Sequence, residues 1–137
     1  MLREARLGQQ RISRKTSAGQ YRRIVEYSSG STVISLAILG KIFGLESVSA
    51  YVSNKTSAAK LKLMQFFGLD LHLFGGPSQP QPDDDRGGIM AARKKAEEDC
   101  GTLNPNQYEN ENNYLAHMRW TAPQILRQLP DVDVVVA

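Results

Sequence analysis

The residues whose types and spacing best suit chemistry form one short run near the start of the chain: Ser28, Ser29, Gly30, Ser31 and Thr32. An apolar segment precedes this run, and an apolar segment with the length of a helix follows it. Such a turn presents hydroxyl groups and unpaired backbone N–H groups at the positive end of a helix dipole. It therefore indicates an anion site, although a turn rich in serine and threonine more often only caps its helix.

The other reactive side chains are isolated along the sequence. The acidic run 83–85 has no partner ligands at a spacing that suits a hard cation. His72 falls in a predicted strand and His117 near a loop, so the two histidines do not indicate a metal site. Cys100 is the only cysteine and has no evident base beside it. From these patterns we predict no metal site, no disulfide and no catalytic residue.

The elements that must position the Ser28–Thr32 turn follow a regular period. Strand-like segments begin near Ile24, Val48 and Leu71, which are 24 and 23 residues apart, and each is followed by a helix with capping residues or by a turn. Strand–helix–strand units of this length pair their strands in parallel through right-handed crossovers. We therefore predict an α/β fold with a parallel sheet. Ligands of such sheets bind beyond the carboxyl ends of the strands, where the turn lies.

The second half of the chain is less regular. A helix is predicted from about residue 89, and the run 104–113 is too polar for a core but too specific in composition for a plain spacer. A short helix is predicted over 122–129. The apolar run 132–137 predicts a strand of the kind found in the middle of a parallel sheet.

Composition and charge set further bounds. The chain has 137 residues and a net charge of only +3, and it contains no apolar run of the roughly 18 to 20 residues that a membrane span needs. Its start has no signal-peptide core, so we predict a soluble cytoplasmic protein. The first 23 residues carry seven basic side chains and one acidic one. That segment suits either a nucleic-acid arm or a solvated helix and linker, and the second is favoured because no aromatic side chain interrupts the cations before Tyr21.

Three ordered stretches of the sequence are similar to one known family. The segment 24–32 (IVEYSSGST) with its following helix, the segment 55–71 with its helix ending MQFFGLDL, and the polar run 104–113 with 117–125 (HMRWTAPQI) occur in the order and spacing of that family. Over residues 23–137 the chain resembles cysteine synthases and the tryptophan synthase β-like, fold-type-II enzymes that use pyridoxal phosphate. The resemblance implies the three-layer αβα fold of their small lobe, followed by the start of the second lobe.

The resemblance also implies roles for particular residues. In that family a serine/threonine loop and a glutamine hold the substrate carboxylate, and by position these are Ser28, Ser29, Gly30, Ser31, Thr32 and Gln107. Ser31 occupies the position of an asparagine that contacts the cofactor ring, and Val33 that of a glycine. The family's Schiff-base lysine and its glycine-rich phosphate loop have no counterpart in the matching segments, so the chain resembles a member truncated at both ends.

These implications define the expected organisation and function. We expect a basic helix and linker over 1–22, a βα-repeat substrate lobe over 23–113, and a helix and strand beginning an incomplete second lobe over 114–137. The resemblance implies pyridoxal phosphate as the cofactor and β-replacement or elimination on a serine-like amino acid as the reaction. Without the lysine and the phosphate loop, we do not expect this chain alone to retain the cofactor or to catalyse.

Three other interpretations remain open from the sequence. The chain can be a non-catalytic remnant, or a regulatory subunit that docks on a complete relative, and a basic nucleic-acid-binding module is less favoured. Association as a homo-oligomer or with a full-length relative is expected, because a two-sided apolar strand at 132–137 without neighbours would leave unpaired edges.

Overall fold

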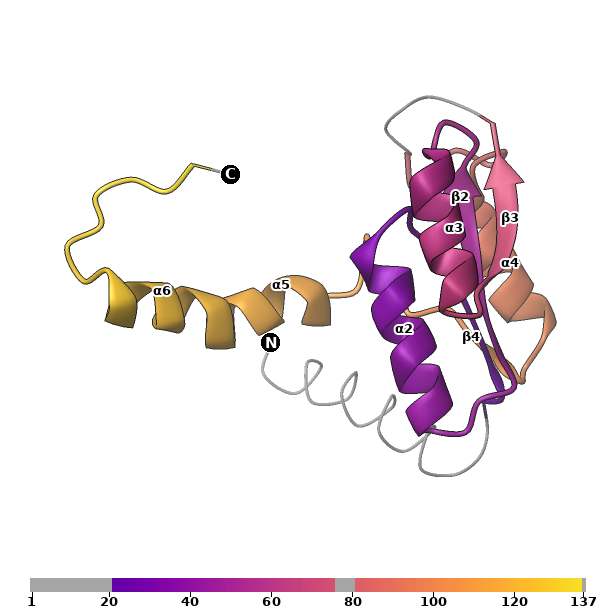
Figure 1. The fold of residues 1–137 in the computed structure, drawn as a ribbon, viewed down its shortest axis with the longest axis horizontal. Helices are drawn as coiled ribbons and strands as arrows, with labels where there is room; N and C mark the ends of the chain where they lie inside the picture. The colour runs from indigo at the N-terminus through magenta and orange to yellow at the C-terminus, as the bar shows by residue number, and fades with distance from the viewer. Residues whose placement is uncertain (1–20, 76–80, 137) are drawn as a thin grey trace.

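A single parallel sheet organises the protein. The structure is a computed structural model that describes residues 21–75 and 81–136. The strand order is β3-β2-β1-β4, and all neighbouring strands run parallel (Figure 1). The bounds of the strands are β1 (Arg23–Tyr27), β2 (Ser47–Ser53), β3 (Asp70–Phe74) and β4 (Thr102–Leu103). The predicted α/β class is confirmed, and the three predicted strands lie where the period placed them. β4 was missed because two residues carry no periodic signal.

Helices cover both faces of this sheet. Figure 1 shows α2 (Ser31–Ile42) and α3 (Ala58–Phe66) side by side over one face, with α4 (Gly88–Glu98) behind the other. The strict alternation of buried residues along β2 directs Val48, Ala50 and Val52 toward α2 and α3. The main core forms there, around the buried side chains Ile24, Val33, Ala37, Val48, Ala50, Val52, Met64 and Leu69. The three-layer αβα arrangement is therefore confirmed.

The α2 helix buries a narrower face than its composition suggests. Val33, Ala37 and Gly40 face the sheet, and Gly40 lets it approach closely, since an added Cβ would lie 2.8 Å from Val48 Cγ2. Ile42 and Phe43, at the end of the helix, are 70% and 67% exposed. An apolar residue on nearly every side of α2 thus does not mean burial on every side of the helix.

The opposite face of the sheet packs on α4. Ile89 and Ala92 are buried there, and α4 contacts β1 and β2. Gly88 begins the helix against the buried ring of Tyr27, where an added Cβ would lie 2.2 Å from Cδ2 of that ring. Only glycine fits at this contact, so α4 starts directly on the last residue of β1.

The C-terminal part of the described chain is one helix that leads away from the sheet (Figure 1). It comprises α5 (Asn112–Ala116), the π-helical turn η1 (His117–Thr121) and α6 (Ala122–Gln128), and the junction residues Ala116 and Ala122 keep helical dihedral angles. The predicted helix 122–129 is therefore the last part of a longer helix.

The strand predicted over 132–137 is wrong for the described residues 132–136. These residues have no regular secondary structure, and Val136 is 92% exposed. A strand requires a neighbour for its backbone groups, and among the described strands β4 and β3 end the sheet without reaching this segment. Apolar composition alone does not make a strand.

The basic N-terminal segment lies almost wholly outside the described residues, which begin at Tyr21. The basic helix and linker expected over 1–22 therefore stay a prediction. None of the helices in the described ranges has the length and hydropathy needed to cross a membrane.

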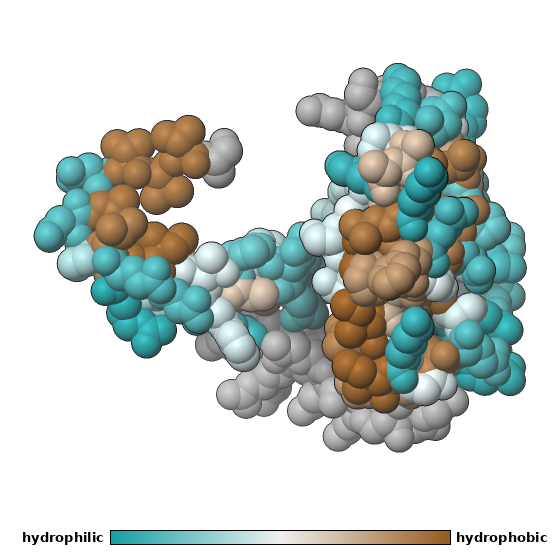
Figure 2. Space-filling view, viewed as in Figure 1, coloured by the Kyte–Doolittle hydropathy of each residue, from teal (hydrophilic) through white to brown (hydrophobic). Residues whose placement is uncertain are grey.

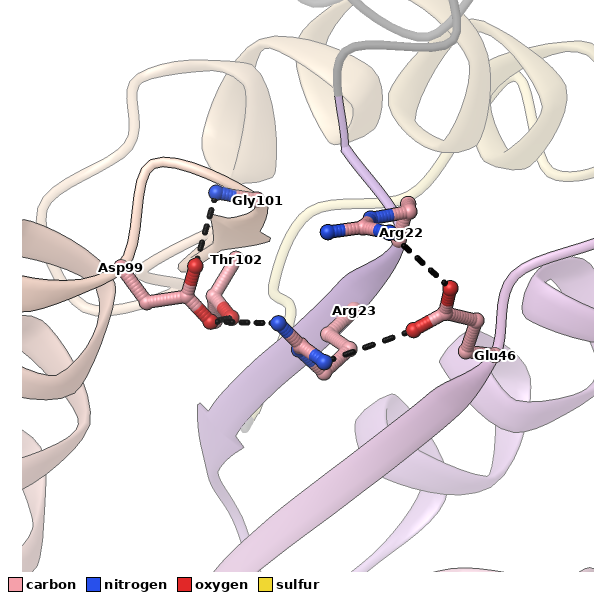
Figure 3. A network of polar contacts seen from close by, with 6 residues as sticks. All are labelled: Arg22, Arg23, Glu46, Asp99, Gly101 and Thr102. Carbon is pink, nitrogen blue, oxygen red and sulfur yellow. Dashed lines mark hydrogen bonds and ion pairs between the residues drawn. The ribbon is translucent and has the colours of Figure 1, made fainter.

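Charged side chains join the amino ends of β1, β2 and β4 (Figure 3). The Arg23 guanidinium donates to Glu46 before β2 (3.4 Å) and to Asp99 before β4 (3.0 Å), while Arg22 lies 3.6 Å from Glu46. Asp99 Oδ2 also accepts the Thr102 hydroxyl at 2.8 Å, and its Oδ1 accepts the Gly101 N–H at 2.9 Å. These hydrogen bonds, together with Arg23, lower the pKa of Asp99 from 3.8 to about 2.

Asp99 predicts a pH dependence of folding stability. Because its pKa is lower in the folded chain than in the unfolded one, its stabilising contribution is present above about pH 3.8 and is lost as the pH falls toward about 2. We expect Asp99→Asn to be less stable than the parent at pH 7, with the difference shrinking over that interval. Urea unfolding at a series of pH values measures it. Asp131→Asn, on the exposed C-terminal segment, is the matched control, and an equal pH dependence of both variants would contradict the assignment.

Candidate functional site

The predicted Ser28–Thr32 turn lies at the carboxyl end of β1, where the strand passes into α2. Ser28 is buried, donates its backbone N–H to Tyr51 O at 3.0 Å, and accepts the Gly30 N–H on its hydroxyl at 3.3 Å. Gly30 is the N-cap of α2, with φ −154° and ψ −141°, and no side chain of the described residues caps the helix. Within residues 21–75 and 81–136 the first N–H groups of α2 thus have no side-chain acceptor, which suits an anion at this turn.

A long-range contact joins this turn to Gln107. The Thr32 hydroxyl donates to Gln107 Oε1 at 2.8 Å, and Gln107 Nε2 donates to Tyr27 O at 2.8 Å. The two motifs are separated by 75 residues in the sequence. The structure therefore brings together the two parts of the site that the family resemblance implied.

Side-chain amides hold the loop after β4 against β1. β4 pairs only with Arg23 and Ile24, so the carbonyls of Val25 and Tyr27 on the same edge of β1 receive no strand partner. Asn104 Nδ2 donates to Val25 O at 2.9 Å, and Gln107 supplies the corresponding bond at Tyr27. Asn104 and Gln107 of the polar run 104–113 thus supply hydrogen bonds to β1 that a longer β4 would have made.

Glu26 is a functional candidate that the sequence prediction missed. It is 1% exposed, and its carboxylate accepts the N–H of Tyr27 at 2.9 Å and that of Gln107 at 3.2 Å. Burial raises the pKa of Glu26 above 4.5, and backbone N–H donors, including that of Asn106, partly oppose the shift. A single acid among the apolar and aromatic residues 24–27 was the signal that could have identified it.

Ser29 and Ser31, which were also predicted to bind the carboxylate, lie in different surroundings from Thr32 and Gln107. Ser31 is exposed, at the first position of α2. Ser29 lines an open hollow of about 370 Å³ beside the start of α3, and neither Thr32 nor Gln107 lines it. The other lining residues are Ser53, Lys55, Thr56, Ser57 and Lys60. The structure therefore unites Thr32 and Gln107 but does not gather all six predicted residues around one point.

The donors at this turn suit a carboxylate. Gln107 Nε2 has two hydrogens, and within the described residues only one is used, by Tyr27 O. The second hydrogen, the serine hydroxyls of the turn and the first N–H groups of α2 are neutral donors at a helix N-terminus, whereas the Thr32 hydroxyl hydrogen is already donated to Gln107 Oε1. Residues 21–75 and 81–136 contain no cluster of three histidine, cysteine or acidic side chains that could hold a metal.

Pyridoxal phosphate requires more than this turn supplies. Its chemistry needs a lysine amine and a cradle for the phosphate. Lys55 and Lys60 line the hollow beside Ser29, and neither is a recorded partner of Thr32 or Gln107. The Ser28–Thr32 turn and Gln107 therefore fit the acid group of a substrate, and within the described residues neither Lys55 nor Lys60 is among their hydrogen-bond partners.

A comparison with known protein families shows to which family the chain belongs. The family described as pyridoxal-phosphate dependent enzyme matches residues 3–137. The chain belongs to this family. Membership implies pyridoxal phosphate as the cofactor of its members and confirms the resemblance that the three sequence motifs indicated.

A curated relative and solved structures agree with this assignment. A cysteine synthase of a Flavobacterium species is 29% identical over 114 residues, which are 82% of this chain and 35% of that protein. An O-ureido-L-serine synthase with bound O-ureido-L-serine is 27% identical, with a TM-score of 0.69 over 91% of this chain and 38% of its own. A hydrogen sulfide-producing enzyme from Fusobacterium nucleatum, 23% identical, shares the fold at a TM-score of 0.64 over 92% of this chain and 40% of its own. The chain spans about a third of the length of the cysteine synthase.

Proposed function

We propose that this chain binds the carboxylate of a serine-type amino acid between the Ser28–Thr32 turn and Gln107. The site corresponds to the substrate part of a cysteine synthase-like enzyme that carries out β-replacement or elimination. The observation that carries the proposal is the 2.8 Å hydrogen bond between Thr32 and Gln107, which unites both expected carboxylate-binding motifs at the N-terminus of α2.

The chemistry of the turn and the names of two relatives support the substrate class. Neutral donors at a helix N-terminus stabilise a single negative charge without requiring a cation. The curated relative is a cysteine synthase, and one solved neighbour is a synthase of O-ureido-L-serine with that serine derivative bound. A serine-type amino acid places its carboxylate in the turn and leaves its β-substituent outside.

We further propose that residues 23–113 form the substrate lobe and that 114–137 begin a second lobe. The sheet, its covering helices and the polar loop lie in the first segment, while the helix that begins at Asn112 leads away from them. Catalysis then needs a Schiff-base lysine and a phosphate loop, which the turn does not provide.

The first test is the affinity for O-acetyl-L-serine. Gln107→Ala removes the side-chain amide that faces Thr32, and we expect an affinity about tenfold weaker than that of the parent chain, as for loss of one charge-assisted hydrogen bond. Titration followed by NMR amide shifts measures this change. Gln124→Ala, the same substitution on exposed α6, is the control and should bind like the parent. Equal affinities of all three proteins, or no binding by the parent, would count against the proposal.

The second test concerns the cofactor. We propose that the 137-residue chain alone is not a working enzyme, whether as part of a larger site, as a remnant or as a regulatory subunit. After incubation with pyridoxal phosphate and gel filtration, we expect no retained visible absorbance band and no lysine labelled by borohydride. The Flavobacterium cysteine synthase, treated in the same way, is the positive control. A retained band with one labelled lysine would overturn this proposal.

We also propose that the C-terminal helix and the segment after it contact another polypeptide, either a second copy or a full-length relative. Apolar side chains gather at this end of the molecule (Figure 2), with Leu126 57%, Leu129 60% and Val135 71% exposed. Soluble monomers rarely expose a contiguous apolar patch of this kind.

The oligomeric state tests this association. We expect light scattering after gel filtration to give a mass above the 15.2 kDa of one chain, or a larger species once the full-length relative is added. The double variant Leu126→Ser, Leu129→Ser should reduce self-association and association with the relative, because it makes the exposed apolar surface polar. Gln124→Ser is the control on the same helix. A parent chain that stays a monodisperse monomer under both conditions would refute the association.

A further inference from the structure

We propose that Glu26 is a positioning residue, which holds Gln107 against the Ser28–Thr32 turn so that the carboxylate site is formed before a substrate binds. The inference rests on the proposed function for what the site binds. It adds a residue that neither the sequence motifs nor the family comparison assigned to the site.

The contacts of Glu26 connect two distant parts of the chain. Oε1 accepts the N–H of Tyr27, the residue before the turn, at 2.9 Å. Oε2 accepts the N–H of Gln107 in the polar loop at 3.2 Å. The buried carboxylate therefore fixes the relative position of the strand end and the loop.

The burial of Glu26 needs an explanation beyond packing. The side chain is 1% exposed, and none of the ion pairs recorded within the described residues involves it. Burying a carboxylate without a cation is unfavourable unless hydrogen bonds compensate. An apolar residue would fill the same space, but it would leave the N–H groups of Tyr27 and Gln107 without these acceptors. The carboxylate is thus suited to organising the backbone around Gln107.

Gln107 is held at every polar group by this arrangement. Glu26 accepts its N–H, Asn113 Nδ2 donates to its carbonyl oxygen at 3.0 Å, and its side-chain amide bonds Thr32 and Tyr27. A side chain already fixed in its binding geometry loses little conformational entropy when a ligand binds. Glu26 therefore increases affinity through Gln107 and does not itself contact the substrate.

A double-mutant cycle on the full chain tests this role. In Glu26→Gln, an NH₂ group replaces one of the two acceptor oxygens. We expect the Gln107 backbone amide resonance to shift upfield, amide exchange of the loop 104–111 to accelerate, and affinity for O-acetyl-L-serine to fall about tenfold. In a Gln107→Ala background, Glu26→Gln should cause no further loss of affinity. Glu98→Gln, which removes one exposed negative charge on α4, is the control and should behave like the parent.

The readouts separate this inference from the proposed function. If the parent does not bind O-acetyl-L-serine, the proposed function fails, while the Gln107 amide shift and loop exchange still decide whether Glu26 positions the loop. An unchanged amide and unchanged exchange in Glu26→Gln overturn the inference. So does an equal loss of affinity in both backgrounds. If Glu26→Gln does not fold, Glu26→Asp keeps the charge on a shorter side chain and takes its place in the same measurements.

Discussion

The unpaired edge of β1 is the constraint on which the rest of the site depends. β4 is only two residues long, so Val25 and Tyr27 present backbone groups on an edge that no strand covers. Buried backbone groups must find partners, and here Asn104, Gln107 and Glu26 supply them from side chains. Gln107 bonds both the Tyr27 carbonyl and the Thr32 hydroxyl. The contact that covers the edge of β1 therefore also forms the candidate site.

The two ends of the sheet use different electrostatics. At the amino ends, Arg23 links two carboxylates in a partly exposed, charged network that connects β1 with the residues before β2 and β4. At the carboxyl ends, the donors are amides, hydroxyls and backbone N–H groups, and the one buried charge among the described residues is that of Glu26. These neutral donors are dipoles that stabilise a negative charge, which suits the carboxylate proposed to bind there. The charged network and the proposed ligand site therefore lie at opposite ends of the sheet, and ligands of parallel sheets usually bind at the carboxyl ends.

The errors of sequence prediction have specific causes. The strands near Ile24, Val48 and Leu71 were predicted because alternation and spacing are local properties of the chain. The segment 132–136 has the composition of a strand but no neighbouring strand among the described residues. Amino-acid composition does not show whether a segment has a partner strand. Likewise α2 is apolar all round, yet only the face toward the sheet is buried.

By itself, the sequence determined the α/β class, the parallel sheet and the position of the Ser28–Thr32 turn, because periodicity and capping residues act over a few neighbouring positions. It pointed to Gln107 only through a family resemblance, which membership of the pyridoxal-phosphate dependent enzymes now confirms at the level of the family. Only the tertiary structure decided that Gln107 meets Thr32 and that Glu26 lies between the strand and the loop. The two residues of each contact are separated by 75 and 81 positions in the sequence, respectively. Tertiary packing brings such residues together, and a local sequence pattern does not predict it.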